Sequence, residues 1–346
     1  MSNPPKRTGY QPLTWEQLEE TIAFFRERLV GQPEVVETLA HVLYKQNALL
    51  KRAVEHEEGR PSIPADPTVL LLAGGSWGKS LAARLIPMAL ARYGQGSLTV
   101  LTPLPQDPEG TLYLDPRLVA VPFATIVVEN IEVAYQMNVR FVGNLAHVLS
   151  TGLIPLVDET HGMVHPIPLG LATFVLTTGV ADAEIRQFLH PEGRLGFLPP
   201  ETEMDPEEAY EEVRRICERS LRQLPPEILR QVDETVILRP LGEDDLRQIF
   251  DLEIAYFEQG IFPGRHLPIR FEGNAHDSLF QEARQGLEVY GVHALRRVLQ
   301  RYIDPVVYRA YNAGQLTEEN LEATQIVIAL QDGKVQVRLV TDADEG

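Results

Sequence analysis

Apolar positions along the chain recur first at helical spacing and then in short continuous runs. Residues 15–44 carry apolar side chains every three or four positions, and Gly31 and Pro33 interrupt them, which predicts two amphipathic helices with the second beginning at Pro33. The apolar run at 68–73 predicts a buried parallel strand that leads into a glycine-rich turn and a helix over 80–93. Further strand-like runs alternate with helical segments such as 139–152, at residues 97–104, 123–130 and 171–179. This alternation predicts an α/β fold with a doubly wound parallel sheet.

The pattern changes past Pro240. Amphipathic helices are predicted over 242–260 and 274–287, a short strand over 268–273, a long helix over 292–314 and a hairpin over 326–340 that turns at Asp332-Gly333. We therefore predict a flexible tail at 1–15, a large α/β domain at 16–238 and a smaller α+β domain at 239–346.

Composition narrows the class of protein. The chain has 346 residues, 44% of them hydrophobic and 23% charged, which is typical of a globular protein with a sizeable core. With 49 acidic and 31 basic residues, its net charge of -18 argues against nucleic acid and anionic membranes as partners. It shows no apolar run of membrane-spanning length and no secretory leader, so a cytoplasmic location is expected. A single cysteine, Cys217, excludes an intramolecular disulfide framework.

The turn after the first predicted strand carries candidate phosphate-binding chemistry. A phosphate-binding loop reads G-x-x-x-x-G-K-[ST], because backbone N–H groups surround the phosphates, the lysine meets their oxygens and the hydroxyl ligates magnesium. Here Ala73 replaces the first glycine, and the loop continues Gly74, Gly75, Ser76, Trp77, Gly78, Lys79, Ser80. The strand before it and the helix after it are the context that the motif requires. Trp77 at the loop tip would stack on a nucleotide or a neighbouring subunit, or pack against the smaller domain.

Six collinear segments resemble the AAA+ modules of Clp proteins and disaggregases. Leu29-Val30-Gly31-Gln32 resembles the V-G-Q box that borders the adenine in that family. The others resemble its Walker B strand (127–134), the segment n-L-L-q-v-L-d-d-G (144–158), the sensor-1 strand (176–179), the P-E-f-l-N-R segment (224–234) and the head of the sensor-2 helix (290–297). The resemblance implies a P-loop AAA+ fold in which the smaller domain is a lid, with ATP or ADP and magnesium as cofactors. It also implies nucleotide contacts from Val30, Gly31 and the loop from Gly74 to Ser80.

The matching positions depart from the family's catalytic residues. Glu129 stands at the magnesium-orienting aspartate and, with Ser80, predicts weakened magnesium coordination. Asn130 stands at the glutamate that polarises the attacking water, and its amide cannot accept a proton. The sensor-1 slot holds Gly179, or Thr178 if the register slips by one, and the sensor-2 slot holds His293. The arginine-finger slot holds Gln231, with Arg230 one position early.

These features leave three hypotheses about function. The first is a protein that binds ATP with little or no hydrolysis and acts as a nucleotide-gated structural or regulatory subunit. The second is a slow but active ATPase that remodels protein complexes, and the third is a nucleotide-free scaffold. In each, the expected partners are other proteins or further copies of the chain in a ring or side-by-side assembly.

Overall fold

The computed structural model describes residues 11–55, 66–115, 121–158, 163–189, 205–260, 266–317 and 320–341. Residues 1–10 of the predicted tail lie outside this part. The chain divides into two compact units, Met1–Phe188 with Met204–Pro240 and Leu189–Glu203 with Leu241–Gly346.

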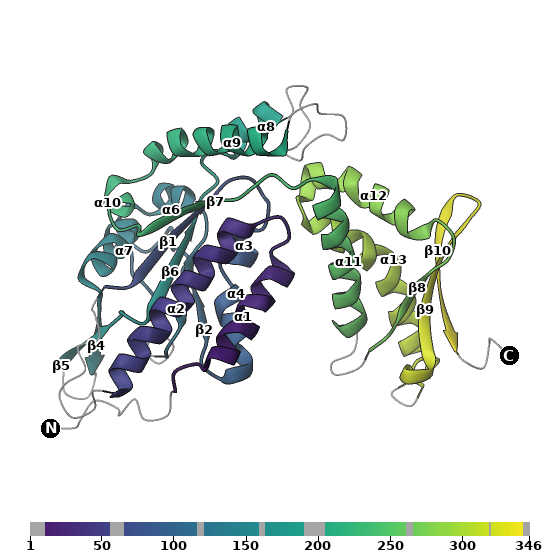
Figure 1. The fold of residues 1–346 in the computed structure, drawn as a ribbon, viewed down its shortest axis with the longest axis horizontal. Coiled ribbons are helices and arrows are strands. Elements are labelled where there is room, and N and C mark those ends of the chain that lie inside the picture. Colours follow the sequence, from purple (N-terminus) through teal and green to yellow (C-terminus); the bar gives the residue numbers. More distant parts are fainter. Residues whose placement is uncertain are drawn as a thin grey trace. The chain divides into compact units, whose positions relative to one another are not determined.

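A five-stranded parallel sheet forms the centre of the first unit (Figure 1). Its order is β2-β3-β6-β1-β7, with β1 at Thr68–Ala73, β2 at Ser97–Val100, β3 at Ala124–Val128, β6 at Ala172–Thr177 and β7 at Glu234–Ile237. Every residue of β1, β3 and β6 is buried, as their continuous apolar runs predict. The doubly wound α/β fold is thereby confirmed. The short edge strand β7 was not predicted, because only Val236 and Ile237 of its four residues are apolar.

Helices flank the sheet, and Figure 1 shows α1 and α2 in front of it. Helix α1 (Trp15–Arg28) begins with a capping box at Thr14, and α2 (Pro33–Glu55) runs well beyond the predicted end near Tyr44. The left-handed Gly31, with φ of 71°, turns the chain between them. The remaining elements of the unit are η1 (Ala91–Tyr93), α6 (Ile131–Met137), α7 (Val139–Thr151), β4 (Leu153–Asp158), β5 (Met163–Pro168), α8 (Asp182–Leu189), α9 (Pro206–Ser220), η2 (Leu221–Gln223) and α10 (Pro226–Leu229).

The helix predicted over 80–93 is broken in the structure. It consists of α3 (Lys79–Ala82) and α4 (Leu85–Leu90), and the amide of Arg84 bonds back only three residues, to Leu81. Pro87 explains the break, since it has no N–H to donate to the carbonyl of residue 83 and its ring would clash with that carbonyl in a continuous helix. Arg84 therefore lies at the junction between the two short helices.

The second unit combines three helices with a small sheet. The helices are α11 (Glu243–Gly260), α12 (Ala275–Tyr290) and α13 (His293–Asn312), and η3 (Leu321–Ala323) leads into the sheet. The sheet has the order β10-β9-β8, with β8 at Ile269–Phe271, β9 at Thr324–Gln331 and β10 at Lys334–Thr341. The predicted turn of the β9–β10 hairpin is confirmed, because Asp332 and Gly333 both have positive φ, 51° and 72°.

Candidate functional site

The loop between β1 and α3, the predicted phosphate-binding loop, turns at two left-handed glycines. Gly74 and Gly78 have φ of 106° and 112°, which L-residues with a side chain rarely adopt. A Cβ on Gly74 would lie 3.0 Å from the carbonyl oxygen of Leu238, whereas nothing lies within 4 Å of the same position on Gly78. The loop is thus packed against the end of β7 on one side and open at Gly78, next to the lysine.

The sequence predicts that Trp77 stands at an exposed loop tip, but in the structure its side chain is buried. It is only 3% exposed, and its ring folds back on the loop, so that a Cβ on Gly75 would lie 2.6 Å from the ring. Ser76 is exposed beside it. The tryptophan therefore stabilises the loop from within.

Lys79 is buried and has anionic and neutral oxygen partners within the protein. Its Nζ donates to the carbonyl oxygen of Gly74 and, at 3.2 Å, to Oδ1 of Asp182. Asp182 opens α8, three residues after Gly179 in the predicted sensor-1 slot. Burial raises the pKa of the Asp182 carboxyl, and the charge and hydrogen bond of Lys79 offset only part of that rise. The lysine that would hold a phosphate is thus paired with a carboxyl group whose ionised form is disfavoured by burial.

Glu129 at the end of β3 is also paired. Its Oε1 accepts from Nη2 of Arg84 at 2.7 Å, and the two side chains are 33% and 40% exposed respectively. Magnesium requires near-octahedral oxygen coordination, and the predicted protein donors are Ser80 and Glu129. With a guanidinium on Glu129, this donor set does not fit magnesium. Arg84 was missed in the sequence because only the helix break brings it to this position.

Asn130 follows Glu129 in a left-handed conformation, with φ of 52° and ψ of 65°. Its backbone N–H donates to Oγ1 of Thr177 at 3.0 Å. The nearby carboxylate of Glu132 accepts from the Thr178 hydroxyl at 2.8 Å and from the Gly179 amide at 2.9 Å. The predicted sensor-1 residues Thr178 and Gly179 are thus bonded to α6 through a carboxylate that the sequence did not single out.

The other predicted site residues lie on other elements of the chain. Arg230 and Gln231 lie where α10 ends, and no hydrogen bond or ion pair joins them to the loop within the described residues. His293 is the exposed first residue of α13 in the second unit. Val30 is buried, and Gly31 turns the chain toward α2.

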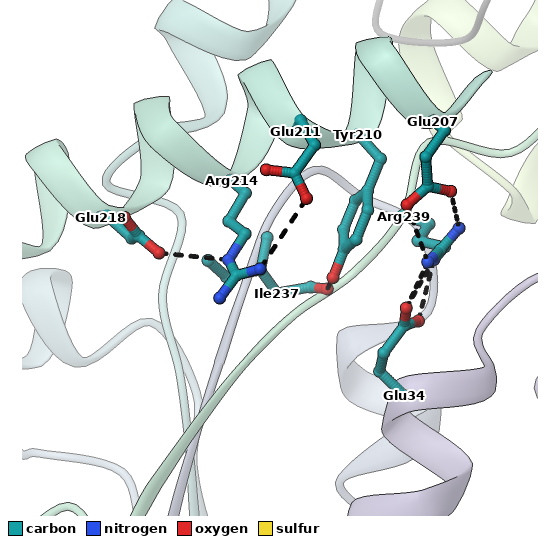
Figure 2. Close-up of polar contacts among 8 residues, drawn as sticks. All are labelled: Glu34, Glu207, Tyr210, Glu211, Arg214, Glu218, Ile237 and Arg239. Carbon is teal, nitrogen blue, oxygen red and sulfur yellow. Dashed lines mark hydrogen bonds and ion pairs between the residues drawn. The ribbon is translucent and has the colours of Figure 1, made fainter. Parts of the chain in front are cut away.

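A second polar cluster surrounds Arg239, just before the end of the first unit (Figure 2). The Arg239 guanidinium bonds the carboxylates of Glu34 and Glu207 and lies 4.2 Å from the centroid of the Tyr210 ring. The side chain of Gln32, the last residue of the predicted V-G-Q box, pairs with both backbone groups of Arg239 at 2.8 and 2.9 Å. The hydrogen bonds that Arg239 donates to the Glu34 carboxylate raise the pKa of Arg239. This cluster joins the predicted adenine-bordering segment to α9 and β7.

Comparison with known protein families and solved structures indicates which family fold this chain has. A family model for the C-terminal, D2-small domain of ClpB protein matches residues 241–324, within the second unit. The closed-state cryo-EM reconstruction of Hsp104 with ATPyS and FITC casein superposes with a TM-score of 0.65 at 14% identity and covers 94% of this chain and 52% of its own. The chain contains an AAA+ module of the Clp and disaggregase type.

Curated relatives of the AAA+ module are ClpB chaperones. Chaperone protein ClpB 1 of Synechococcus elongatus is 33% identical over 110 residues, which is 32% of this chain and 12% of the relative. Chaperone protein ClpB of Vibrio cholerae is 22% identical over 224 residues, which is 64% of this chain and 22% of the relative. The matches thus span less than a quarter of these chaperones. Proteins of this type generally bind nucleotide with magnesium.

Within its described residues, the AAA+ module has no helix that combines the length and the apolar character needed to cross a membrane. That same part contains no cluster of three or more His, Cys, Asp or Glu side chains placed to hold a metal ion. The single cysteine, Cys217 on α9, is buried, and burial raises the pKa of its thiol to about 12. A protonated thiol at neutral pH is not a nucleophile.

Proposed function

We propose that this AAA+ module binds ATP or ADP through the loop from Gly74 to Ser80 and hydrolyses it slowly or not at all. Bound nucleotide then gates a structural or regulatory role in an assembly with protein partners or further copies of the chain. The observation that carries the proposal is an asymmetry at the site. The groups that hold phosphate are kept, while every carboxylate near the predicted water-activating position is already bonded.

Phosphate binding is supported by the loop itself. Gly74 and Gly78 have the positive φ values of a phosphate-binding turn, and the position beside Gly78 is open. Lys79 lies at the start of α3 and already binds one anion, the Asp182 carboxylate, at 3.2 Å. Its ammonium would exchange that carboxylate for a phosphate oxygen, which carries more charge.

Weak hydrolysis is supported by the partners of the acidic residues. A general base needs a carboxylate within reach of a water and free to accept its proton. Asn130 has no carboxylate, Glu129 is paired with Arg84, and Glu132 accepts from Thr178 and Gly179. The slow-ATPase hypothesis requires one of these bonds to open during turnover.

A second candidate function is favoured by the Lys79–Asp182 pair. Because Asp182 supplies an internal anion to the lysine, the loop remains electrically balanced without a nucleotide. A nucleotide-free scaffold would keep this pair permanently.

Titration of a fluorescent ATP analogue separates these functions. Wild type should give a saturable signal, Lys79→Ala should weaken binding by about a hundredfold through loss of a charged phosphate contact, and the exposed Lys45→Ala should bind as wild type does. Absence of saturable binding to wild type would establish the scaffold. Steady phosphate release from wild type, abolished by Lys79→Ala, would establish the slow ATPase.

A further inference from the structure

Two ion pairs occupy the site where nucleotide chemistry is expected, and they have opposite arrangements. At Lys79 a protein carboxylate meets the phosphate-binding cation, at 3.2 Å. At Glu129 a protein cation, the Arg84 guanidinium, meets the predicted magnesium-binding carboxylate, at 2.7 Å. Each of the two cations is therefore already paired with a carboxylate of the protein.

We propose that the Arg84 guanidinium takes the place of a divalent cation beside Glu129, so that this chain binds nucleotide phosphates without magnesium. The inference rests on the proposed function, because it concerns the same loop. It assigns a positioning and charge-compensating role to a residue five positions after Lys79, at the break between α3 and α4.

The local backbone explains why Arg84 reaches this place. The chain leaves the helical path after Ala82, and Arg84 precedes α4 with φ of -108° and ψ of -5°. From that junction the guanidinium extends to the carboxyl end of β3, where Glu129 lies. Glutamate is one methylene longer than the aspartate usual at this position, so its carboxylate extends further from the strand end.

The chemistry of the pair favours the guanidinium over magnesium. A guanidinium is always protonated and forms directional hydrogen bonds to carboxylates and phosphates. Magnesium gives up its water reluctantly and needs an ordered set of oxygen ligands. The structure offers it Ser80 and a glutamate whose Oε1 is engaged.

Arg84 keeps donors that a phosphate would accept. Of its guanidinium N–H groups, only Nη2 has a partner among the residues that the structure describes. The side chain is 40% exposed, so its remaining terminal donors are reachable from solvent. Arg84 therefore neutralises Glu129 and retains hydrogen-bonding capacity toward an incoming anion.

Magnesium dependence of nucleotide affinity tests the proposal. The full chain is titrated with N-methylanthraniloyl-ATP in excess magnesium chloride and, separately, in excess EDTA. Wild type should bind with the same dissociation constant, within about twofold, in both. For Arg84→Ala, loss of the charged group should weaken binding in EDTA by about tenfold, and magnesium should restore most of it. Arg84→Lys keeps the charge and should stay closer to wild type.

The matched control is Arg215→Ala, which removes an exposed arginine that pairs with Glu212 on α9. Its affinity should be that of wild type in both solutions. Saturable binding of wild type only in magnesium overturns this inference and leaves the proposed function standing. Absence of saturable binding in both solutions overturns the proposed function and this inference together.

Discussion

The first unit contains two charged clusters of similar composition in which the pKa of a carboxyl is shifted in opposite directions. In the Arg239 cluster, burial opposes ionisation of Glu34, but the hydrogen bonds and charge of Arg239 outweigh it and lower the pKa of that carboxyl. In the loop cluster, burial raises the pKa of Asp182 and Lys79 offsets only part of the rise. The Arg239 cluster thus favours its ionised pairs, whereas the Lys79–Asp182 pair is less favourable and would be easier to replace with a pair between Lys79 and a phosphate.

Loss of the Arg239 guanidinium should have the largest effect. Arg239→Ala leaves Glu34 and Glu207 without their shared cation and removes the contact with Tyr210, so we expect unfolding free energy to fall by about 2 to 3 kcal/mol. Chemical denaturation measures it. Arg215→Ala, at an exposed helical pair, should change stability by less than about 0.5 kcal/mol. Equal effects of the two substitutions would contradict a stabilising role for the cluster.

Replacement of the Asp182 carboxylate should tighten nucleotide binding. Asp182→Asn removes the anion that competes with phosphate for Lys79, and we expect an increase in affinity of about tenfold, or about 1.4 kcal/mol. Fluorescence titration measures it, with Asp251→Asn on α11 as a control that removes one charge from the second unit. If Asp182→Asn binds more weakly than wild type, the carboxylate supports the site rather than competing for it.

The same carboxylate should make stability depend on pH. Because the pKa of Asp182 is higher in the folded state than in the unfolded state, its favourable contribution is full below the unfolded pKa of about 4 and is lost as pH rises through the folded pKa. Asp182→Asn should therefore match wild type in acid and exceed its unfolding free energy by about 1 kcal/mol at neutral pH. Denaturation curves at several pH values measure the gap. A gap that narrows as pH rises would have the wrong sign.

The Arg84–Glu129 pair should contribute least to stability. Both side chains are about one-third or more exposed, and such pairs are worth little. Glu129→Gln should change the unfolding free energy by less than about 0.5 kcal/mol, measured by thermal or chemical denaturation. A loss above 1 kcal/mol would place this pair with the Arg239 cluster as a structural contact.

Sequence patterns predicted the parts of the fold that depend on neighbouring residues. Continuous apolar runs located β1, β3 and β6, and the Asp332-Gly333 dipeptide located the second unit's hairpin. The sequence does not reveal the short strand β7, because its four residues contain no continuous apolar run. It does not reveal the helix break at Arg84 either, because the apolar spacing stays helical on both sides of Pro87. The glycine-rich motif located the loop, whose backbone is left-handed at Gly74 and Gly78.

The charge pairs of the candidate site were out of reach of sequence patterns. Lys79 and Asp182 are 103 positions apart, and Arg84 and Glu129 are 45 apart, so no local spacing encodes either pair. Only the parallel sheet brings the ends of β1, β3 and β6 to one edge, where these side chains meet. The predicted roles of Gly179, Gln231 and His293 stay predictions.

The left-handed backbone at Asn130 limits how this site can change. Asparagine tolerates such a conformation, whereas a glutamate there would cost about 1 kcal/mol in backbone strain. Introducing a glutamate at position 130 by one substitution would therefore strain the turn at the end of β3. A carboxylate base could be engineered at this position only after the turn itself is redesigned.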